Sequence, residues 1–522
     1  MASRQNLDAR SPPSAGPTAS NVNVLDKAIS YVSPRLGLQR ARARAATEVL
    51  LRYDGARQTR NSEGWVATGS GANVEVGGDM ARLRNRLRDL VRNNSHARKA
   101  LRVWTTNVVG TGIMPRANTG DKNLDAIIDR NFKEWSSRCD ADGQLDFFGL
   151  QALIVRTERM SGECLVRYRI NSAIDSGSPL ELQLLEPDFI DATKQFFPDP
   201  AGEYCILGVR FDERGKRIGY WLYNRHPGEL IVQSLKTFVS KSVPAEEIQH
   251  IYYKERPGQV RGVPDFSTII AKLRDLGDYA DAELVRKKIE ACLAAFVESP
   301  DGADAPPLGQ TTVSPKGQRI EEFSPGMVAY TNPGEKVTLN NPVAAGGYRD
   351  YKTTELHETA AGAGVMYEQM TGDNSQVNYS SYRAGHLEFR GDVEQYRWLL
   401  LIPMALQPIW NRFIDTLAVA GQIPEANYGV KWTPPTFQSI DPEKDANAQK
   451  TRVRGGVQTL PEAIAEEGHD FEEQMAEIAA TNKRLDEMGI LLTTDPRNFD
   501  DRGMLHGAAA EESGETPTPD KQ

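Results

Sequence analysis

One segment of the sequence resembles a catalytic metal motif. His357 opens the run HETAA. A helix carrying HExxH would place two imidazoles one turn apart around a zinc ion, with the glutamate as general base. Here Ala361 stands in the place of the second histidine. Because one of the two zinc-binding imidazoles is absent, we interpret this segment as a polar helix face.

No other motif indicates catalysis. Ser161 lies in ERMSGECL, but it has no glycine two positions before it and it precedes a predicted strand, whereas the serine of a nucleophile elbow follows one. Neither a GxxxxGK[ST] phosphate-binding loop nor a GxGxxG turn opening a helix occurs. We therefore predict that the protein is not an enzyme and hydrolyses neither ATP nor DNA.

The residue types that bind metals are scattered along the chain. The four cysteines form no CxxC pair, so we interpret them as free thiols. The seven histidines are not paired at ligand spacing. We predict no cofactor and no bound metal. Carboxylates are abundant, but the sequence does not show which of them meet in space, so nuclease or glycosidase chemistry has no support.

Composition indicates a folded protein of more than one domain. The 522 residues exceed the usual size of one compact domain, and two to four are expected. No stretch approaches 18 uninterrupted apolar residues, and the N-terminus lacks the apolar core of a signal peptide, so we predict no membrane partner and synthesis in a cytoplasm. The net charge of −9 argues against a coat for nucleic acid, because lysine and arginine supply most DNA affinity. Any DNA contact should be local or transient.

The first half of the chain reads as helices followed by strands, which predicts an α+β fold. From Asp79 to Val103 apolar residues recur at helical spacing and arginines fill other positions, so one amphipathic helix with a basic face is predicted. We favour a solvated or ion-paired surface for that face over a phosphate site. Runs of β-branched and aromatic residues between 180 and 255 predict an antiparallel sheet.

The second half is mainly helical. Helical spacing covers about thirty residues from Pro264, and it returns from Tyr348 to Met370 after a small β-containing insertion. Tyr382 to Ala420 is predicted to be a helix kinked at Pro403 and Pro408, because proline removes a backbone donor and clashes with the preceding turn. Helical spacing resumes over residues 441–488.

Several segments together resemble the lambda-type bacteriophage portal proteins. They occur in order and extend over most of the chain between its two polar ends: RYDGARQTR, LRNRLRDLVRNNSHARKA, NVVGTGI, FFGLQALIVRTERMSGECLVRY, LQLLEPD, ERPGQVRGVPDFSTII, DYADAELVRKKIEAC and NYSSYRAGHLEF. The resemblance implies a portal-type fold with an α/β wing, a helical stem, a small β-containing clip, a kinked tunnel helix and a helical crown.

Residue ranges can be assigned to these parts by pattern. The assignment is a disordered N-terminal tail at 1–25, the wing at 26–263, a stem helix at 264–297, the clip at 298–347, a second stem helix at 348–370, the tunnel loop at 371–383, the wing continuation with the tunnel helix at 384–440, the crown at 441–492 and a C-terminal tail at 493–522.

The resemblance also implies a function and a set of partners. The subunit would form a homo-oligomeric ring, usually of twelve, at one capsid vertex of the virion, assembled in the host cytoplasm. Double-stranded DNA would pass through it, and its other partners would be the terminase large subunit, the head–tail connector protein, and the major capsid and scaffold proteins. Candidate channel residues are Lys352, Asn374, Ser375, Gln376, Asn378, Tyr379 and Arg383.

Two other classes of protein stay open at this point. One is a DNA-processing enzyme whose acidic residues bind Mg²⁺, and the other is a non-viral scaffold protein. Negative-stain microscopy would separate them, because a ring of about a dozen subunits with a central channel favours the portal, whereas a compact monomer with nuclease activity favours the enzyme.

Overall fold

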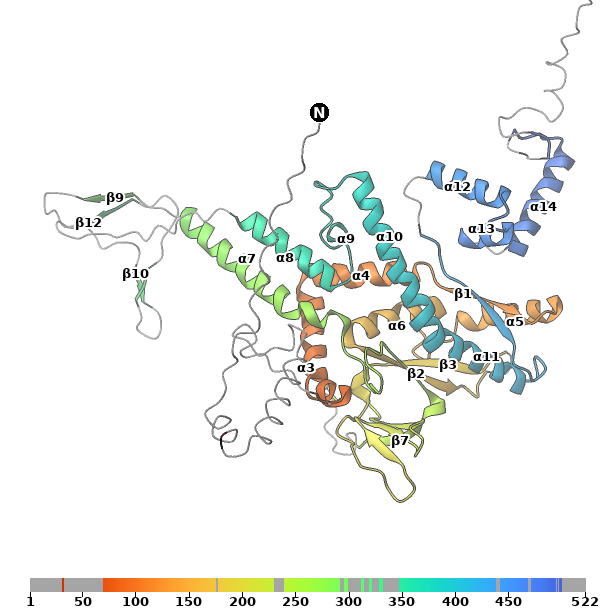
Figure 1. The fold of residues 1–522 in the computed structure, drawn as a ribbon, viewed down its shortest axis with the longest axis horizontal. Helices are drawn as coiled ribbons and strands as arrows, with labels where there is room; N and C mark the ends of the chain where they lie inside the picture. The colour runs from red at the N-terminus through yellow and green to blue at the C-terminus, as the bar shows by residue number, and fades with distance from the viewer. Residues whose placement is uncertain are drawn as a thin grey trace, which may run out of the picture. The chain divides into compact units, whose positions relative to one another are not determined.

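The computed structural model describes Tyr31 and residues 69–499, apart from 175–176, 230–238, 292–294, 299–310, 314–318, 322–327, 332–346, 438–441, 468–470, 494 and 496. The chain divides into two units, Met1–Ser70 and Gly71–Gln522, and the elements below belong to the second (Figure 1). The predicted N-terminal tail lies outside the described residues, as does most of the C-terminal one.

The arginine-rich segment forms two helices, so the prediction of one continuous helix is wrong. Helix α3 spans Ala72–Asn93 and α4 spans Ser95–Val109. Asn94 interrupts them because its side-chain oxygen accepts hydrogen bonds from the backbone N–H groups of His96 and Ala97, at 3.0 and 3.1 Å, which caps α4. Two further helices follow, α5 (Lys122–Ser136) and α6 (Phe147–Ser161).

The strands predicted between 180 and 255 form antiparallel pairs, as expected, but they belong to two small sheets instead of one. The first has the order β3-β2-β8 and the second β4-β5-β6-β7, while β1 pairs with β13. Strand β3 ends just before Pro187, which cannot donate a backbone hydrogen bond to a neighbouring strand and begins a short 3₁₀ helix, η3 (Pro187–Phe189). The strands are β1 (Met114–Asn118), β2 (Glu163–Ile170), β3 (Leu180–Leu185), β4 (Tyr204–Ile206), β5 (Val209–Phe211), β6 (Arg217–Leu222), β7 (Lys241–Pro244), β8 (Ile248–Tyr252) and β13 (Gly429–Thr433).

Two helices flank the predicted β-containing insertion. A 3₁₀ turn, η6 (Asp265–Ile269), leads into α7 (Ile270–Ala291), and α8 (Tyr348–Gly362) packs against α7 (Figure 1). Strand β9 (Ala295–Glu298) begins within the range predicted to be helix, and it pairs in parallel with β12 (Val328–Thr331). A hairpin of β10 (Thr311–Val313) and β11 (Arg319–Glu321) lies between them in sequence.

The second helix of this pair is shorter than predicted. Instead of continuing to Met370, α8 ends at Gly362 and a separate helix, α9, spans Tyr367–Thr371. Gly364 lies between them with a φ of +61°, a left-handed conformation that stops a helix and favours glycine.

The long helix near the end of the core begins earlier than predicted. Asn378 caps α10 (Tyr379–Tyr396), since its side chain accepts a hydrogen bond from the Ser381 N–H, so the loop between α9 and α10 is shorter than the range 371–383 assigned to it. A π-helix, η7 (Arg397–Leu406), and α11 (Gln407–Val419) continue the chain. Pro403 is accommodated within the wider π-helical turns, and Pro408 lies in the first turn of α11, where its missing donor costs little.

The core is aromatic where α5, α6 and α11 meet. Trp135 and Phe413 lie 4.9 Å apart between ring centroids, and Phe132 and Phe147 meet edge to face at 5.4 Å. The chain then continues through α12 (Pro442–Arg454), α13 (Leu460–Glu466) and α14 (Phe471–Met488), as predicted for a helical C-terminal part. Among the described residues, no helix combines the length and the hydropathy that a membrane span requires.

Candidate functional site

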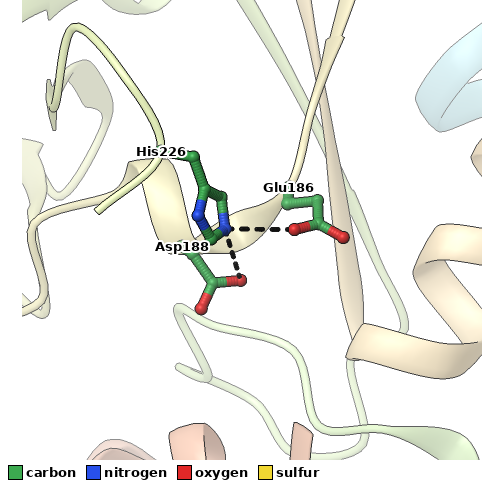
Figure 2. A group of neighbouring side chains, drawn as sticks. All are labelled: Glu186, Asp188 and His226. Atoms are coloured by element: carbon green, nitrogen blue, oxygen red, sulfur yellow. Dashed lines mark ion pairs between the residues drawn. The ribbon is translucent and has the colours of Figure 1, made fainter. Parts of the chain in front are cut away.

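One group of described residues has the ligand types of a metal site. Glu186, Asp188 and His226 bring their oxygen and nitrogen atoms within 4.8 Å of one another (Figure 2). His226 Nε2 lies 3.1 Å from a Glu186 oxygen and 3.9 Å from an Asp188 oxygen. The sequence did not reveal this group, because His226 lies 38 residues beyond Asp188 and only the fold brings them together.

The charges around this group do not fit a cation. Arg88 lies 2.7 Å from Asp188 and 3.3 Å from Glu186, and Arg84 lies 3.0 Å from Asp188. These guanidinium groups already neutralise both carboxylates. The Gly228 N–H donates to His226 Nδ1 at 3.0 Å, so the proton of the neutral ring lies on Nε2, where a metal would need a lone pair. We interpret the group as an ion-pair cluster.

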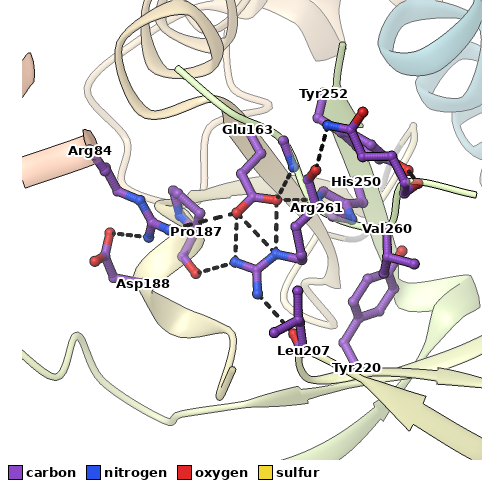
Figure 3. A network of polar contacts seen from close by, with 12 residues as sticks. Arg84, Glu163, Pro187, Asp188, Leu207, Tyr220, His250, Tyr252, Val260 and Arg261 are labelled. Carbon is purple, nitrogen blue, oxygen red and sulfur yellow. Dashed lines mark hydrogen bonds and ion pairs between the residues drawn. The ribbon is translucent and has the colours of Figure 1, made fainter. Parts of the chain in front are cut away.

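Arg84 connects this cluster to a buried polar network around Glu163, the first residue of β2 (Figure 3). Both Glu163 and Arg261 are almost fully buried. Arg261 Nη2 lies 2.6 Å from one carboxylate oxygen, and Arg261 Nε lies 2.9 Å from the other. The backbone N–H of Gly262 and the ring of His250 complete the shell of Glu163, at 3.1 and 2.9 Å.

The ionisation of this network follows from its partners. The positive charge of Arg261 and the hydrogen bonds to Glu163 hold the pKa of that carboxyl well below its usual range, despite burial. Burial lowers the pKa of His250 to about 4, so the ring is neutral at pH 7. Arg217 can only donate to His250 Nδ1, at 3.0 Å, which leaves the ring proton on Nε2 for the bond to Glu163.

The network also fixes two backbone segments. Arg261 donates to the carbonyl oxygens of Leu207 and Pro187, at 2.9 and 3.3 Å. Two glycines permit the close approach of the chain beside Glu163, since a Cβ at Gly262 would lie 1.9 Å from the carbonyl oxygen of Gly162. The network therefore joins α3, β2, η3 and the segment that enters α7.

Its members come from the segments that carry the portal resemblance. Arg84 and Arg88 belong to LRNRLRDL, Glu163 to GECLVRY, Asp188 to LQLLEPD and Arg261 to ERPGQVRGV. These segments mix charged with apolar residues, and an isolated charge is expensive to bury without a partner. Their pairing could be found only from the fold.

A second buried cluster lies beside it. The Tyr396 hydroxyl donates to Glu158 at 2.8 Å, and the Arg159 guanidinium lies over the Trp104 ring, 3.6 Å from its centroid, while pairing with Asp265. Complete burial raises the pKa of Glu158 to about 7. This carboxyl is therefore half protonated near neutral pH.

Glu158 should make stability depend on pH. The pKa of Glu158 is higher in the folded chain than in the unfolded chain. Between about pH 4.5 and 7 the unfolded chain therefore releases a proton that the folded chain keeps, so the free energy of unfolding falls as pH rises through this window. Between pH 5 and 8 the free energy of unfolding of the wild type should fall by about 2–3 kcal/mol through this group, and that of Glu158→Gln should not. Urea unfolding of both proteins measures the difference. Glu134→Gln, at an exposed position of α5, is the control. An equal pH dependence in all three proteins would contradict the assignment.

The residues of the two motifs that resemble catalytic ones, HETAA and ERMSGECL, make ordinary structural contacts. His357 and Glu358 lie exposed on α8, where the His357 ring stacks on Tyr367 at 4.2 Å and Glu358 pairs with Lys272. This agrees with the polar helix face predicted for HETAA. Ser161 is buried at the end of α6 and its hydroxyl accepts a hydrogen bond from Arg88 at 3.2 Å. Of the cysteines, 139, 164 and 205 are free and buried, as predicted, and Cys292 lies outside the described residues.

The candidate channel residues occupy three elements. Lys352 lies on α8 with its ammonium 5.7 Å from the Tyr348 ring centroid. The side chains of Asn374, Ser375 and Gln376 are exposed in the loop between α9 and α10, and Asn378 is the cap of α10. Tyr379 and Arg383 lie in the first turns of α10, not in the loop, and Arg383 is 3.3 Å from Asp445.

Comparison with known proteins identifies the class of this α+β chain. Residues 58–397 match the family described as phage portal protein, lambda family. The chain belongs to this family. Portal proteins are structural components of the virion, so the predictions of a virion protein and of no enzymatic activity are confirmed.

Individual relatives agree. The chain is 26% identical to a probable portal protein of Halomonas phage phiHAP-1, over 83% of this chain and 87% of the relative. It is 22% identical to the portal protein of Escherichia phage N15, over 79% and 86%, and 21% identical to portal protein B of Escherichia phage lambda, over 82% and 91%.

Solved structures that are similar come from gene transfer agent particles. A chain in the neck of an empty particle computed with C6 symmetry matches with a TM-score of 0.39 and 14% identity, covering 75% of this chain and 93% of that one. A chain in the neck of a native particle computed with C12 symmetry matches with a TM-score of 0.38 and 15% identity, with the same coverage.

Proposed function

We propose that this chain is the subunit of a closed ring through which double-stranded DNA enters and leaves the head at one capsid vertex. The observation that carries this proposal is that the family match of residues 58–397 spans strands β1 to β12, both helices of the α7–α8 pair and all of α10. These are the parts from which a wall and a channel would be built. The ring would also nucleate head assembly.

The parts of the ring can be assigned by the order of the elements along the chain. We assign α3 to α6 and the sheets to the wing, α7 and α8 to the stem, the strands between them to the clip, α10 to α11 to the tunnel helix of the wing, and α12 to α14 to the crown. The described loop between α9 and α10 would be the tunnel loop. Lys352, the loop side chains, Tyr379 and Arg383 would face the channel.

The partners are those of a conduit that does no chemistry of its own. A terminase large subunit would dock during packaging and supply the energy of ATP hydrolysis, and the head–tail connector would dock afterwards. The major capsid and scaffold proteins would surround the ring during head assembly. The overall net charge of −9 suits a channel that must not retain phosphate, because each lysine or arginine contact adds affinity for DNA.

Ring formation is directly testable. We expect mass photometry of the purified chain to show a species near twelve times the 57.8 kDa subunit mass, and negative-stain images to show a central channel. A heterologous contact closes only at a fixed rotation, so one ring size should dominate. A chain that remains monomeric at micromolar concentration, in virions that also lack rings, would overturn the proposal.

A further inference from the structure

The three C-terminal helices leave an open apolar groove. Helix α12 packs on α13, and α13 packs on α14 (Figure 1). A cavity of about 520 Å³ is lined by one face of α12 and one face of α13, because the lining residues of each helix recur three, four and seven positions apart. The apolar residues that line it are Ala446, Val453, Leu460, Ala463 and Ile464. We call this cavity the α12–α13 groove.

The walls of this groove bury little within one chain. Helix α12 buries none of its 13 residues, and the Leu460 side chain at the start of α13 is 48% exposed. A helix of this length is marginal in water, because most helical stability in proteins comes from packing one face against a partner. The open apolar groove therefore indicates a surface that another segment covers.

A second exposed apolar surface follows α14. Four large apolar side chains within five residues are between 43% and 68% exposed: Met488, Ile490, Leu491 and Leu492. We call these four residues the apolar tip. Gly489 turns the chain out of the helix with a φ of +66°, and the Ile490 N–H donates to the Leu485 carbonyl oxygen at 3.0 Å, which is the Schellman arrangement of a helix end.

An ion-pair clamp holds the apolar tip in place. Arg497, which follows the tip, lies 3.2 Å from Asp486 of α14 and 2.8 Å from Asp495. The Asp495 N–H donates to the Leu492 carbonyl oxygen at 3.0 Å. The chain on both sides of the tip is thus tied to the end of α14. A tip that is already ordered loses less conformational freedom when it binds.

The apolar tip of a chain is held away from the groove of the same chain. Gln474, in the first turn of α14, lines the α12–α13 groove, whereas Met488 is the last residue of α14. At 1.5 Å per residue, the helix between these two residues is about 21 Å long. Only a break in α14 would bring the tip to its own groove, but the tip of another copy can enter it.

We propose that the apolar tip of one subunit inserts into the α12–α13 groove of the next copy around the ring. The proposal rests on the proposed function, since it names a contact by which that ring would close. An apolar protrusion and a pocket elsewhere on the same chain form a heterologous contact, which gives a ring when the rotation closes. At about 30 Å³ for a water-sized group, a four-carbon side chain needs about 120 Å³, so the groove has room for Ile490, Leu491 and Leu492.

A second copy suits these surfaces better than other partners do. The apolar tip carries no charged side chain, and affinity for DNA comes mainly from lysine and arginine contacts with phosphates. A different protein would have to supply both a groove for the tip and an apolar segment for the groove. A neighbouring subunit supplies both.

Cross-linking tests the contact directly. A chain with Leu460→Cys and Leu491→Cys carries one thiol in the groove and one on the tip. Cys292→Ser is added, because the other three native cysteines are buried. After treatment with a short bis-maleimide, we expect denaturing gels to show a ladder of multiples of 57.8 kDa, because each tip is joined to the next subunit. Leu460→Cys combined with Val419→Cys, at an exposed position of α11, is the control and should give no ladder.

A charge on the tip gives a second measurement. Leu491→Asp would place a carboxylate in the apolar groove, so we expect ring formation by mass photometry to need about a hundredfold more protein than the wild type. Val419→Asp makes the same kind of change at a side chain that is 90% exposed, and it should assemble as the wild type does. Circular dichroism melting should be the same for all three proteins.

The outcomes are distinguishable. Rings that form without a ladder, or that form from Leu491→Asp at wild-type concentrations, would overturn the inference and leave the ring intact. A cross-link confined to the monomer would show that the tip folds into its own groove, and it would also overturn the inference. A wild type that forms no ring under any condition would overturn the proposed function itself.

Discussion

Replacing Arg261 by methionine should lower the free energy of unfolding by about 3–5 kcal/mol, because it leaves the Glu163 charge buried without its partner. Glu163 is fully buried, and only His250, the Gly262 N–H and the more distant Arg84 would remain around it. The Leu207 and Pro187 carbonyl oxygens would lose their donor as well. Urea unfolding monitored by tryptophan fluorescence measures the change.

The matched control is Arg256→Met. Arg256 makes an ion pair with Glu75 at 2.6 Å, but both side chains are about half exposed, so the loss should stay below about 1 kcal/mol. Adding Glu163→Gln to Arg261→Met removes the unpaired charge and should recover part of the lost stability. Equal effects of Arg261→Met and Arg256→Met would show that the buried network contributes nothing specific.

Periodicity and composition predicted most helices and strands because those signals are local. The helices of the first half and the strand runs between 180 and 255 follow from residues that contact their near neighbours in sequence. The break at Asn94 and the end of α8 near Gly364 were missed because each is decided by one residue within a strong apolar pattern: a capping side chain in one case and a left-handed backbone in the other.

The polar networks could not be predicted in the same way. Glu163 and Arg261 are 98 residues apart, and Glu158 and Tyr396 are 238 apart. Each charge was visible in its own segment, but the partner is chosen by tertiary packing. The predicted channel residues differ again, because their role depends on neighbouring subunits, and a single chain shows only which of them are exposed.

Shortening the loop between α9 and α10 should leave ring assembly and head formation intact but sharply reduce packaged DNA. Removal of Asn374 to Ser380 is one variant that the predicted tunnel-loop range of 371–383 suggests. That deletion would also remove the Asn378 cap and the first residues of α10, and the loss of the cap alone costs about 1 kcal/mol. Removing only Asn374 to Val377 retains both that cap and Gly372 at the end of α9.

The expected result follows from the surroundings of these four residues. Three of their side chains are exposed and the fourth, Val377, is half-buried, so their loss removes little apolar contact from the fold. A polar loop that buries little can adjust around a moving duplex, and we expect its absence to let packaged DNA slip back. DNase-protected genome per head should fall to a small fraction of the wild-type amount. A same-length Gly/Ser replacement separates loop length from side chains, and a loss of rings in either variant would make this segment an intersubunit contact instead of a channel element.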